Sequence, residues 1–124
     1  MAEHERPIRI LLVEDEAMIA MLIEDMVADI GGELVATATR LDNALAQASE
    51  REIDFAILDL NLGGMLTYPV ADLLKQRGIP FVFATGYGAG GLAKGYENET
   101  ALEKPFTTST LERVMKQAMA VKPV

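Results

Sequence analysis

Short apolar runs alternate along the chain with longer segments whose apolar residues recur every three or four positions. The short runs have the length and branched-residue content of buried strands, and the longer segments have the period of amphipathic helices. The predicted strands are residues 8–13, 34–39, 55–58, 81–84 and 100–102. The predicted helices are residues 19–30, 41–50, a segment from Val70 that Gly78 ends, a short or mobile helix around Leu92, and residues 109–121.

This alternation is typical of α/β proteins in which helices cover both faces of a parallel sheet. Five such units predict a flavodoxin-like, doubly wound, five-stranded parallel sheet of order 2-1-3-4-5 with about five helices. The weakest part of the pattern is residues 86–95, where five glycines fall. Each interior glycine destabilises a helix by about 1 kcal/mol relative to alanine. We predict one domain over residues 1–124, because the chain has no linker and no internal repeat.

Composition narrows the possible functions. Nineteen acidic against eleven basic residues give a net charge of −8, so repulsion from a phosphate backbone argues against nucleic-acid binding. The polar amino terminus lacks the apolar segment of a signal peptide, and no apolar run is long enough to span a bilayer. We therefore expect a cytoplasmic protein with no membrane partner. The absence of cysteine excludes disulfides and thiolate metal sites.

Acidic, hydroxyl and amine groups stand at the carboxyl ends of the predicted strands. Glu14 and Asp15 end the first strand, and Asp59 ends the third. Thr85 ends the fourth strand and Lys104 follows the fifth. Ligand sites of doubly wound sheets lie beyond this edge of the sheet. We therefore expect these side chains to share one pocket.

Three carboxylates at close range repel one another, so at least one of them has a raised pKa unless a cation is present. Mg²⁺ binds oxygen ligands and keeps several waters, which suits a site with few carboxylates. We predict Mg²⁺ as the cofactor, with Asp15 and Asp59 as direct ligands. Glu14 is expected to bind through a water molecule and Asn61 through its backbone carbonyl.

With the cation bound, the Asp59 carboxylate is a candidate nucleophile toward phosphorus. The catalytic demand is then alignment and charge neutralisation of the transferred group. Lys104 can pair with one phosphoryl oxygen. The Thr85 hydroxyl and backbone amides near Leu60 and Gly86 can bind another.

The chain resembles response-regulator receivers in four segments, which are LLVEDEAM, AILDLNLGG, PFVFATGYG and LEKPF. The resemblance covers essentially the whole chain. It implies that Asp59 accepts a phosphoryl group from a histidine kinase or a histidine phosphotransfer protein. It also implies Glu14-Asp15 as the acidic pair, Thr85 as the switch hydroxyl and Lys104 as the phosphate-contacting lysine. A cis peptide bond before Pro105 is a further implication.

One position departs from the usual receiver pattern. Receivers carry Tyr or Phe three residues before the lysine, and here that residue is Ala101. The missing ring and the run from Pro80 to Tyr87 resemble a narrower branch, the FAT GUY receivers. These occur in alphaproteobacterial signalling, including the general stress response, often as single-domain regulators. We hypothesise that a substitute switch lies in Thr85, Gly86 and Tyr87 or in the glycine-rich segment behind them.

Met18 and Met21 fall outside the apolar stripe of the first predicted helix. Two interpretations stay open. They are incidental apolar residues of the surface, or they form a docking face for the helix pair of a kinase or phosphotransfer protein, to which flexible apolar side chains are suited.

The leading hypothesis is therefore a single-domain response regulator, a monomer that is a regulatory phosphoacceptor rather than an enzyme and acts on an unidentified downstream protein. An alternative is a phosphatase-like enzyme with an aspartyl-phosphate intermediate. Such an enzyme would need a second carboxylate two residues after the nucleophile, where this chain has Asn61. A flavodoxin-like electron carrier would need a hydroxyl- and glycine-rich phosphate loop after the first strand, where this chain has acids.

Overall fold

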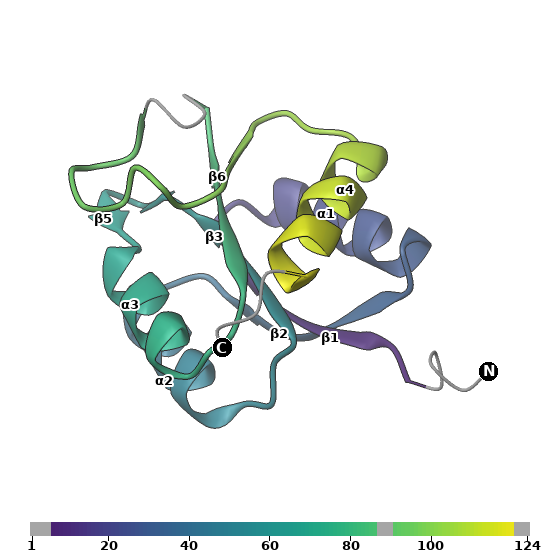
Figure 1. The fold of residues 1–124 in the computed structure, drawn as a ribbon, viewed down its shortest axis with the longest axis horizontal. Helices are drawn as coiled ribbons and strands as arrows, with labels where there is room; N and C mark the ends of the chain where they lie inside the picture. Colours follow the sequence, from purple (N-terminus) through teal and green to yellow (C-terminus); the bar gives the residue numbers. More distant parts are fainter. Residues whose placement is uncertain (1–5, 87–90, 121–124) are drawn as a thin grey trace.

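A five-stranded parallel sheet lies between two layers of helices (Figure 1). The computed structural model describes residues 6–86 and 91–120. The strands of the sheet are β1 (Ile8–Val13), β2 (Gly32–Ala38), β3 (Phe55–Asp59), β6 (Phe81–Thr85) and β7 (Ala101–Glu103). The helices are α1 (Ala17–Asp29), α2 (Leu41–Glu50), α3 (Tyr68–Gln76) and α4 (Thr108–Ala120). The strand order β2-β1-β3-β6-β7 confirms the predicted doubly wound order.

The alternation of side chains along each strand divides the core into two halves. Leu11, Val13 and Leu58 pack with the buried residues of α2 and α3 on one face. Ile10 and Leu12 pack with those of α1 and α4 on the other face. Because both faces of the central strands are covered, these strands are apolar at nearly every position. Each fully buried aliphatic side chain contributes about 1.5–3 kcal/mol.

Glycine is required at both positions after α1, but for a different structural reason at each. Gly31 has φ 84°, which a residue with a side chain rarely adopts, and it ends the helix. Gly32 already begins β2. A Cβ on Gly32 would lie 2.9 Å from Ile10 Cδ1 and 3.0 Å from Val27 Cγ1. The second strand therefore starts two residues before the predicted position, where the chain passes close to β1 and α1.

A short antiparallel hairpin follows β3 where the sequence predicted only a loop. Its strands are β4 (Asn61–Leu62) and β5 (Met65–Leu66). Gly63 and Gly64 connect them with φ values of 61° and 93°. A two-residue connection with positive φ at both positions matches the twist of a hairpin. The glycine pair is thus required by the turn at residues 63–64, which reverses the chain after β4.

Of the short helix expected around Leu92, the described residues show only Gly91 in a 3₁₀ turn, and residues 92–100 form turns, bends and irregular chain. Residues 87–90, among them the expected switch residue Tyr87, lie outside the described part of the chain. Four α-helices are therefore found in residues 6–86 and 91–120, not about five. The glycine content of this segment opposes a helix, and side-chain contacts with α3 hold residues 92–100 instead.

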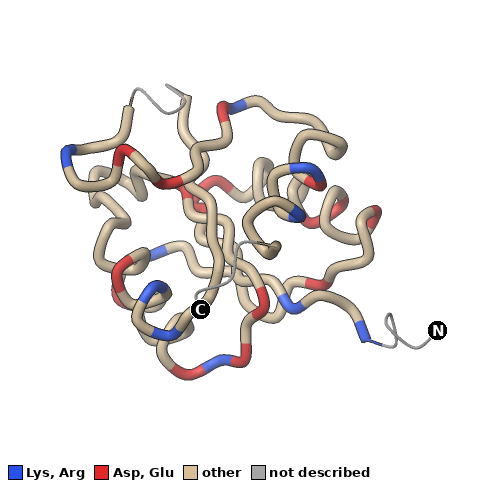
Figure 2. Tube along the Cα trace, in the orientation of Figure 1, with Lys and Arg blue, Asp and Glu red and all other residues tan. Residues whose placement is uncertain are grey.

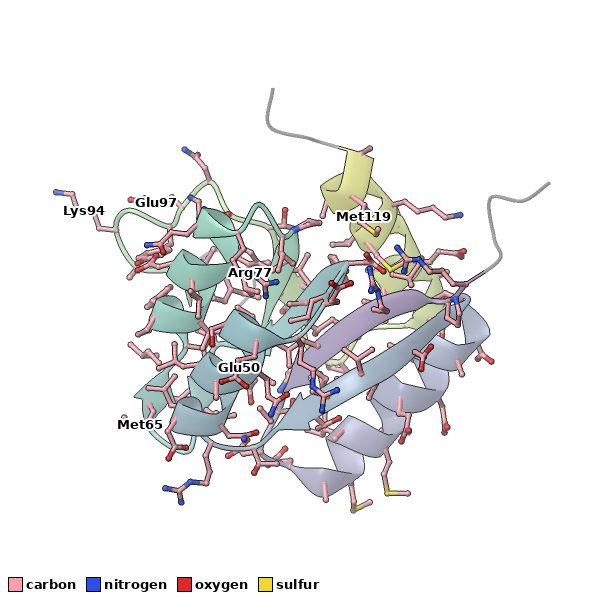
Figure 3. The ribbon with its side chains drawn as sticks, turned by 90° about the horizontal axis from the view of Figure 1, so that it is seen from below. Glu50, Met65, Arg77, Lys94, Glu97 and Met119 are labelled. Atoms are coloured by element: carbon pink, nitrogen blue, oxygen red, sulfur yellow. The ribbon has the colours of Figure 1, made fainter. Side chains whose placement is uncertain are left out.

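Side-chain contacts also join the helices on one face of the sheet. The Arg77 guanidinium, at the end of α3, donates hydrogen bonds to the backbone carbonyls of Ala48 at 2.6 Å and Arg51 at 2.9 Å, at the end of α2 (Figure 3). Lysine and arginine residues are dispersed among acidic residues along the trace (Figure 2). In the described residues no helix has both the length and the apolar character needed to cross a bilayer.

Candidate functional site

The predicted site residues meet at the carboxyl edge of the sheet because the parallel strands end nearly level. Val13 pairs in register with Leu58, so the two residues after β1 lie beside Asp59. Asp59 in turn pairs with Ala84, the residue before Thr85. The last residue of β7, which precedes Lys104, pairs with Thr85 itself. Four segments that are distant in sequence therefore contribute to one rim.

Three carboxylates form a close cluster at this rim. One oxygen from each of Glu14, Asp15 and Asp59 lies within 4.8 Å of the other two. Glu14 is only 1% exposed and Asp59 is 9% exposed, whereas Asp15 is open to solvent. The Glu14 carboxylate accepts hydrogen bonds from Lys104 Nζ at 3.0 Å and from the backbone N–H of Glu16 at 3.2 Å. Glu14 is thus held in place by the protein, while Asp15 faces water.

Lys104 bridges two of the carboxylates. Its Nζ lies 3.0 Å from Glu14 Oε1 and 3.5 Å from Asp59 Oδ2. Burial favours the neutral amine, but the hydrogen bond to Glu14 and the charges of Glu14 and Asp59 outweigh it, so the pKa of Lys104 is raised. The lysine therefore remains a cation beside the Asp59 carboxylate. The peptide bond between Lys104 and Pro105 is cis, which confirms what the resemblance to receivers implied.

The Asp59 carboxyl group has a pKa raised to about 6, mainly because burial disfavours the charged form. Lys104 opposes this effect, the negative charges of Glu14 and Asp15 add to it, and the backbone N–H of Asn61 opposes it through a hydrogen bond to Asp59 Oδ1. The raised pKa expected from the sequence is therefore present, but burial is its largest cause and the repulsion between carboxylates only adds to it.

The donor set fits a hard divalent cation. All the candidate ligand atoms are oxygens, two of the carboxylates are buried or nearly so, and the exposed Asp15 leaves space for retained waters. The Asn61 side chain is engaged in the hairpin, where its Oδ1 accepts a hydrogen bond of 2.7 Å from the backbone N–H of Gly64. The side chain of Asn61 is therefore occupied, and its backbone carbonyl, two residues after Asp59, stays the candidate ligand.

The hydroxyl and backbone groups predicted to bind phosphoryl oxygens lie on the same edge. Thr85 is 5% exposed and is the last residue of β6. Its backbone carbonyl accepts a hydrogen bond of 2.9 Å from the backbone N–H of Lys104, so the ends of β6 and β7 are joined. The space beside Gly86 is open, since a Cβ there would meet nothing within 4 Å. The position three residues before the lysine, Ala101, lies in register with Phe83.

Two features of the site were not found by sequence reasoning. The first is the ion pair between Lys104 and Glu14, because the sequence suggested only phosphate as the partner of the lysine. The second is Thr67, a residue with 0% exposure whose hydroxyl donates a hydrogen bond of 2.7 Å to the backbone carbonyl of Asp59. A threonine before a helix is an ordinary N-cap signal, so nothing in the sequence marked this residue.

A doubly wound sheet with a lysine ammonium beside a buried strand-end aspartate, itself next to an acidic pair, defines the class of receiver domains. The comparison with known families agrees. The chain belongs to the response regulator receiver domain family, which it matches over residues 10–116.

Three relatives illustrate the similarity. SdrG from Sphingomonas melonis Fr1 is 40% identical, with a TM-score of 0.80, over 93% of this chain and 98% of that chain. The receiver domain of the response regulator PhyR from Erythrobacter litoralis is 27% identical, with a TM-score of 0.83, over 97% and 95% of the two chains. The Phyllosphere-induced regulator PhyR of Methylorubrum extorquens is 35% identical over 115 residues. This match covers 89% of the chain but 43% of that relative, so the chain spans less than half its length.

Proposed function

We propose that this chain is a single-domain response regulator in which Asp59 accepts a phosphoryl group from a phosphohistidine. The donor is a histidine kinase or a histidine phosphotransfer protein. The observation that carries the proposal is the position of the buried Asp59 carboxylate, 3.5 Å from Lys104 Nζ and within 4.8 Å of two further carboxylates. Phosphoryl transfer to a carboxylate requires a nucleophile, a positively charged side chain held in place, and oxygen ligands for a metal ion.

In the proposed reaction an oxygen of the Asp59 carboxylate forms a bond to phosphorus. The bond between phosphorus and the donor nitrogen breaks, and its electron pair remains on the imidazole. Lys104 pairs with one phosphoryl oxygen and Thr85 donates to another. Glu14 keeps Lys104 in place through their 3.0 Å contact.

Asp59, Asp15 and the Asn61 carbonyl would hold Mg²⁺ directly, with Glu14 acting through water. The ion, when bound, supplies positive charge that offsets the charges of the carboxylates and of the transferred group.

The test is incubation of the protein with Mg²⁺ and acetyl phosphate or phosphoramidate, followed by intact mass measurement. We expect the mass of one phosphoryl group to be gained by the wild-type chain and by Asp25→Asn, which changes an exposed carboxylate of α1. Asp59→Asn should gain nothing. Failure of the wild type to be modified, or equal modification of Asp59→Asn, would overturn the proposal.

We place the docking face for the phosphodonor on α1. Met18 and Met21 are 79% and 65% exposed, and Leu22 beside them is 59% exposed. Next to them lies a groove of about 300 Å³ between α1 and the segment after β7. The groove is lined by Ile19, Leu22, Ile23, Met26, Lys104, Pro105 and Phe106. A helical partner seated on α1 would therefore lie beside Lys104, and hence beside Asp59.

Changing both Met18 and Met21 to glutamate should slow phosphotransfer from a protein donor about tenfold, equivalent to about 1.4 kcal/mol of lost interface stability. The rate with acetyl phosphate should not change, because these side chains lie outside the carboxylate cluster. The measurement compares both donors on the same preparation. Equal slowing with the two donors would mean that the substitutions disturb the site rather than the docking.

We place the switch in the segment that follows Thr85. Residues 92–100 lack a helix, and side chains hold them on α3. The Tyr96 ring stacks on Tyr68 with centroids 4.1 Å apart, and its hydroxyl donates to the Asp72 carboxylate at 2.9 Å. Lys75 pairs with Glu99 at 2.6 Å. Lys94, in contrast, projects away from the protein (Figure 3). Such a segment can change its position without unfolding a helix.

The two tyrosines also connect this segment to the site. Tyr68 and Tyr96 both meet Phe83 edge-on, with centroid distances of 5.4 and 6.4 Å. Phe83 precedes Thr85 by two residues, on the same strand face, and pairs in register with Ala101. Residue 101 has no ring, but Tyr68 from α3 and Tyr96 from the loop both contact its neighbour Phe83. This arrangement supports the substitute-switch hypothesis.

Binding of beryllofluoride with Mg²⁺ should shift the backbone amide signals from Gly86 to Thr100. Tyr96→Ala should shift the signals of residues 91–100 before any ligand is added, because the stack and the bond to Asp72 are both removed. Two-dimensional NMR of the two proteins provides the comparison. Signals from Gly86 to Gly95 that stay unchanged on beryllofluoride binding would exclude this segment as the switch.

The names of two relatives support a proposal about the pathway. One relative that is 27% identical is described as the PhyR stress response regulator, and PhyR from Bartonella quintana, 25% identical, as an anti-anti-sigma factor. We propose a role in the general stress response of alphaproteobacteria, in the cytoplasm and as a monomer, with an effect exerted on a downstream protein or on the supply of phosphoryl groups. The role is regulatory, since Asn61 stands where a phosphatase-like enzyme would have its second carboxylate.

A further inference from the structure

Thr67 is a fully buried threonine between the β4–β5 hairpin and α3. Its hydroxyl donates a hydrogen bond of 2.7 Å to the backbone carbonyl of Asp59 and lies 3.3 Å from that of Leu60. Its backbone N–H donates to the Leu60 carbonyl at 3.0 Å. The exposure of Thr67 is 0%, so water has no access to replace these bonds. One residue therefore binds two successive carbonyls at the candidate nucleophile.

The position of Thr67 in the sequence suggests a different role. Thr67 is the N-cap residue of α3, where a threonine hydroxyl usually accepts a hydrogen bond from the first turn of the helix. No such bond is made here. The N–H groups of Val70 and Ala71 instead reach the backbone carbonyl of Thr67, at 3.0 and 3.2 Å. The hydroxyl is thus directed away from the helix that it begins and toward the end of β3.

Other contacts hold residues 59–61, the short segment that Thr67 binds, from the side of β6. The backbone N–H of Leu60 donates to the Ala84 carbonyl at 3.0 Å, which ties the segment to β6 beside Thr85. The N–H of Asn61 lies 3.4 Å from Asp59 Oδ1. Thr67 supplies the contacts on the side of α3. The direction of the Asp59 side chain and the position of the Asn61 carbonyl both depend on this segment.

We propose that Thr67 is a positioning residue for phosphoryl transfer, which sets the geometry of Asp59 through the backbone carbonyls of Asp59 and Leu60. This inference rests on the proposed function, because it concerns the same nucleophile. The Thr67 hydroxyl binds backbone carbonyls rather than the Asp59 carboxylate, so its proposed role is to position the nucleophile and not to react. A misplacement of about 1 Å at a reacting group can reduce a rate by about 100-fold. A lost hydroxyl bond at this carbonyl therefore has a measurable effect on phosphorylation.

The central experiment compares Thr67→Val with Thr67→Ser. Valine has nearly the shape of threonine but no donor, and serine restores the donor. We expect Thr67→Val to lower the maximal rate of Asp59 phosphorylation by acetyl phosphate about 10- to 100-fold at saturating Mg²⁺. The donor concentration at half-maximal rate should change little. Thr67→Ser should stay within about threefold of the wild type, because the hydroxyl itself carries the effect.

A control separates positioning from stability. Val70→Ala removes a fully buried side chain from the start of the same helix and leaves the hydroxyl in place. It should destabilise the fold without a matching loss of maximal rate. Thr67→Ala serves as a second variant if Thr67→Val does not fold. In both hydroxyl-free variants the NMR signals of the Leu60 and Asn61 amides should shift, while those of α4 should not.

The outcomes discriminate between the two proposals. A wild-type protein that takes up no phosphoryl group overturns the proposed function, and this inference with it. A phosphorylated wild type with an unimpaired Thr67→Val overturns the inference alone. A Val70→Ala variant as slow as Thr67→Val, or a Thr67→Ser variant as slow as Thr67→Val, also overturns it.

Discussion

Replacing Lys104 by methionine should slow phosphorylation of Asp59 by acetyl phosphate by about 100-fold or more. Methionine keeps an unbranched apolar side chain but removes the ammonium, which lies 3.5 Å from Asp59 Oδ2. A preorganised donor directed at the charge that develops in the transition state typically contributes a factor of about 10²–10³. The rate is measured by intact mass spectrometry over time at saturating Mg²⁺.

The matched control is Lys116→Met, which removes an exposed ammonium that pairs with Glu112 within α4. This variant should react like the wild type, because an exposed ion pair of this kind contributes at most about 0.5 kcal/mol and lies outside the site. A Lys104→Met variant whose rate stays within about threefold of the control would remove the lysine from the proposed mechanism.

The same substitution tests how much the Lys104–Glu14 ion pair contributes to the stability of the fold. Without the lysine, the nearly fully buried Glu14 carboxylate keeps only the N–H of Glu16 as a described hydrogen-bond donor. Breaking a buried pair by removing one partner destabilises a protein by about 3–5 kcal/mol. Partial exposure of Lys104 reduces this to about 1–3 kcal/mol here. Adding Glu14→Gln to Lys104→Met should restore part of the loss in urea denaturation, since the unpaired charge is then removed.

Asp15→Asn should remove most of the stabilisation of the fold by Mg²⁺. A cation that binds only the folded state raises the free energy of unfolding by about 1.4 kcal/mol at ten times its dissociation constant. We expect this gain in the wild type. In Asp15→Asn the cation loses a carboxylate ligand, and an affinity lowered by about 10- to 100-fold reduces the gain at the same concentration to about 0.4 kcal/mol or less.

The stability difference between Asp15→Asn and the wild type should disappear when Mg²⁺ is removed with EDTA. The cluster then contains uncompensated carboxylates, and the charges of Glu14 and Asp15 both contribute to the raised pKa of Asp59. Asp15→Asn reduces this repulsion, so it should not destabilise the Mg²⁺-free protein. Thermal unfolding with and without Mg²⁺, with Asp25→Asn as the control, measures both signs. An equal response of Asp15→Asn and the wild type to Mg²⁺ would place the cation elsewhere.

The sequence by itself determined which segments form the central strands of the sheet and which residues form the site. Apolar runs such as Ile10–Val13 and Phe55–Leu58 predicted buried central strands, because strands that are covered on both faces require apolar residues at consecutive positions. The change from such a run to an acid marked where these two strands end. Since parallel strands end at one edge, Asp15 and Asp59 were predicted to meet although 44 residues separate them.

The tertiary structure alone decided how the chain is held around that edge. The hydroxyl of Thr67 binds the end of β3 rather than α3, and Tyr96 binds Asp72 and Tyr68 in place of a helix. Lys104 pairs with Glu14 across 90 residues. A local pattern reports which face of an element is apolar, because that face is set by the period of the backbone. It does not report which polar partner lies opposite a side chain, since that depends on the packing of segments distant in sequence.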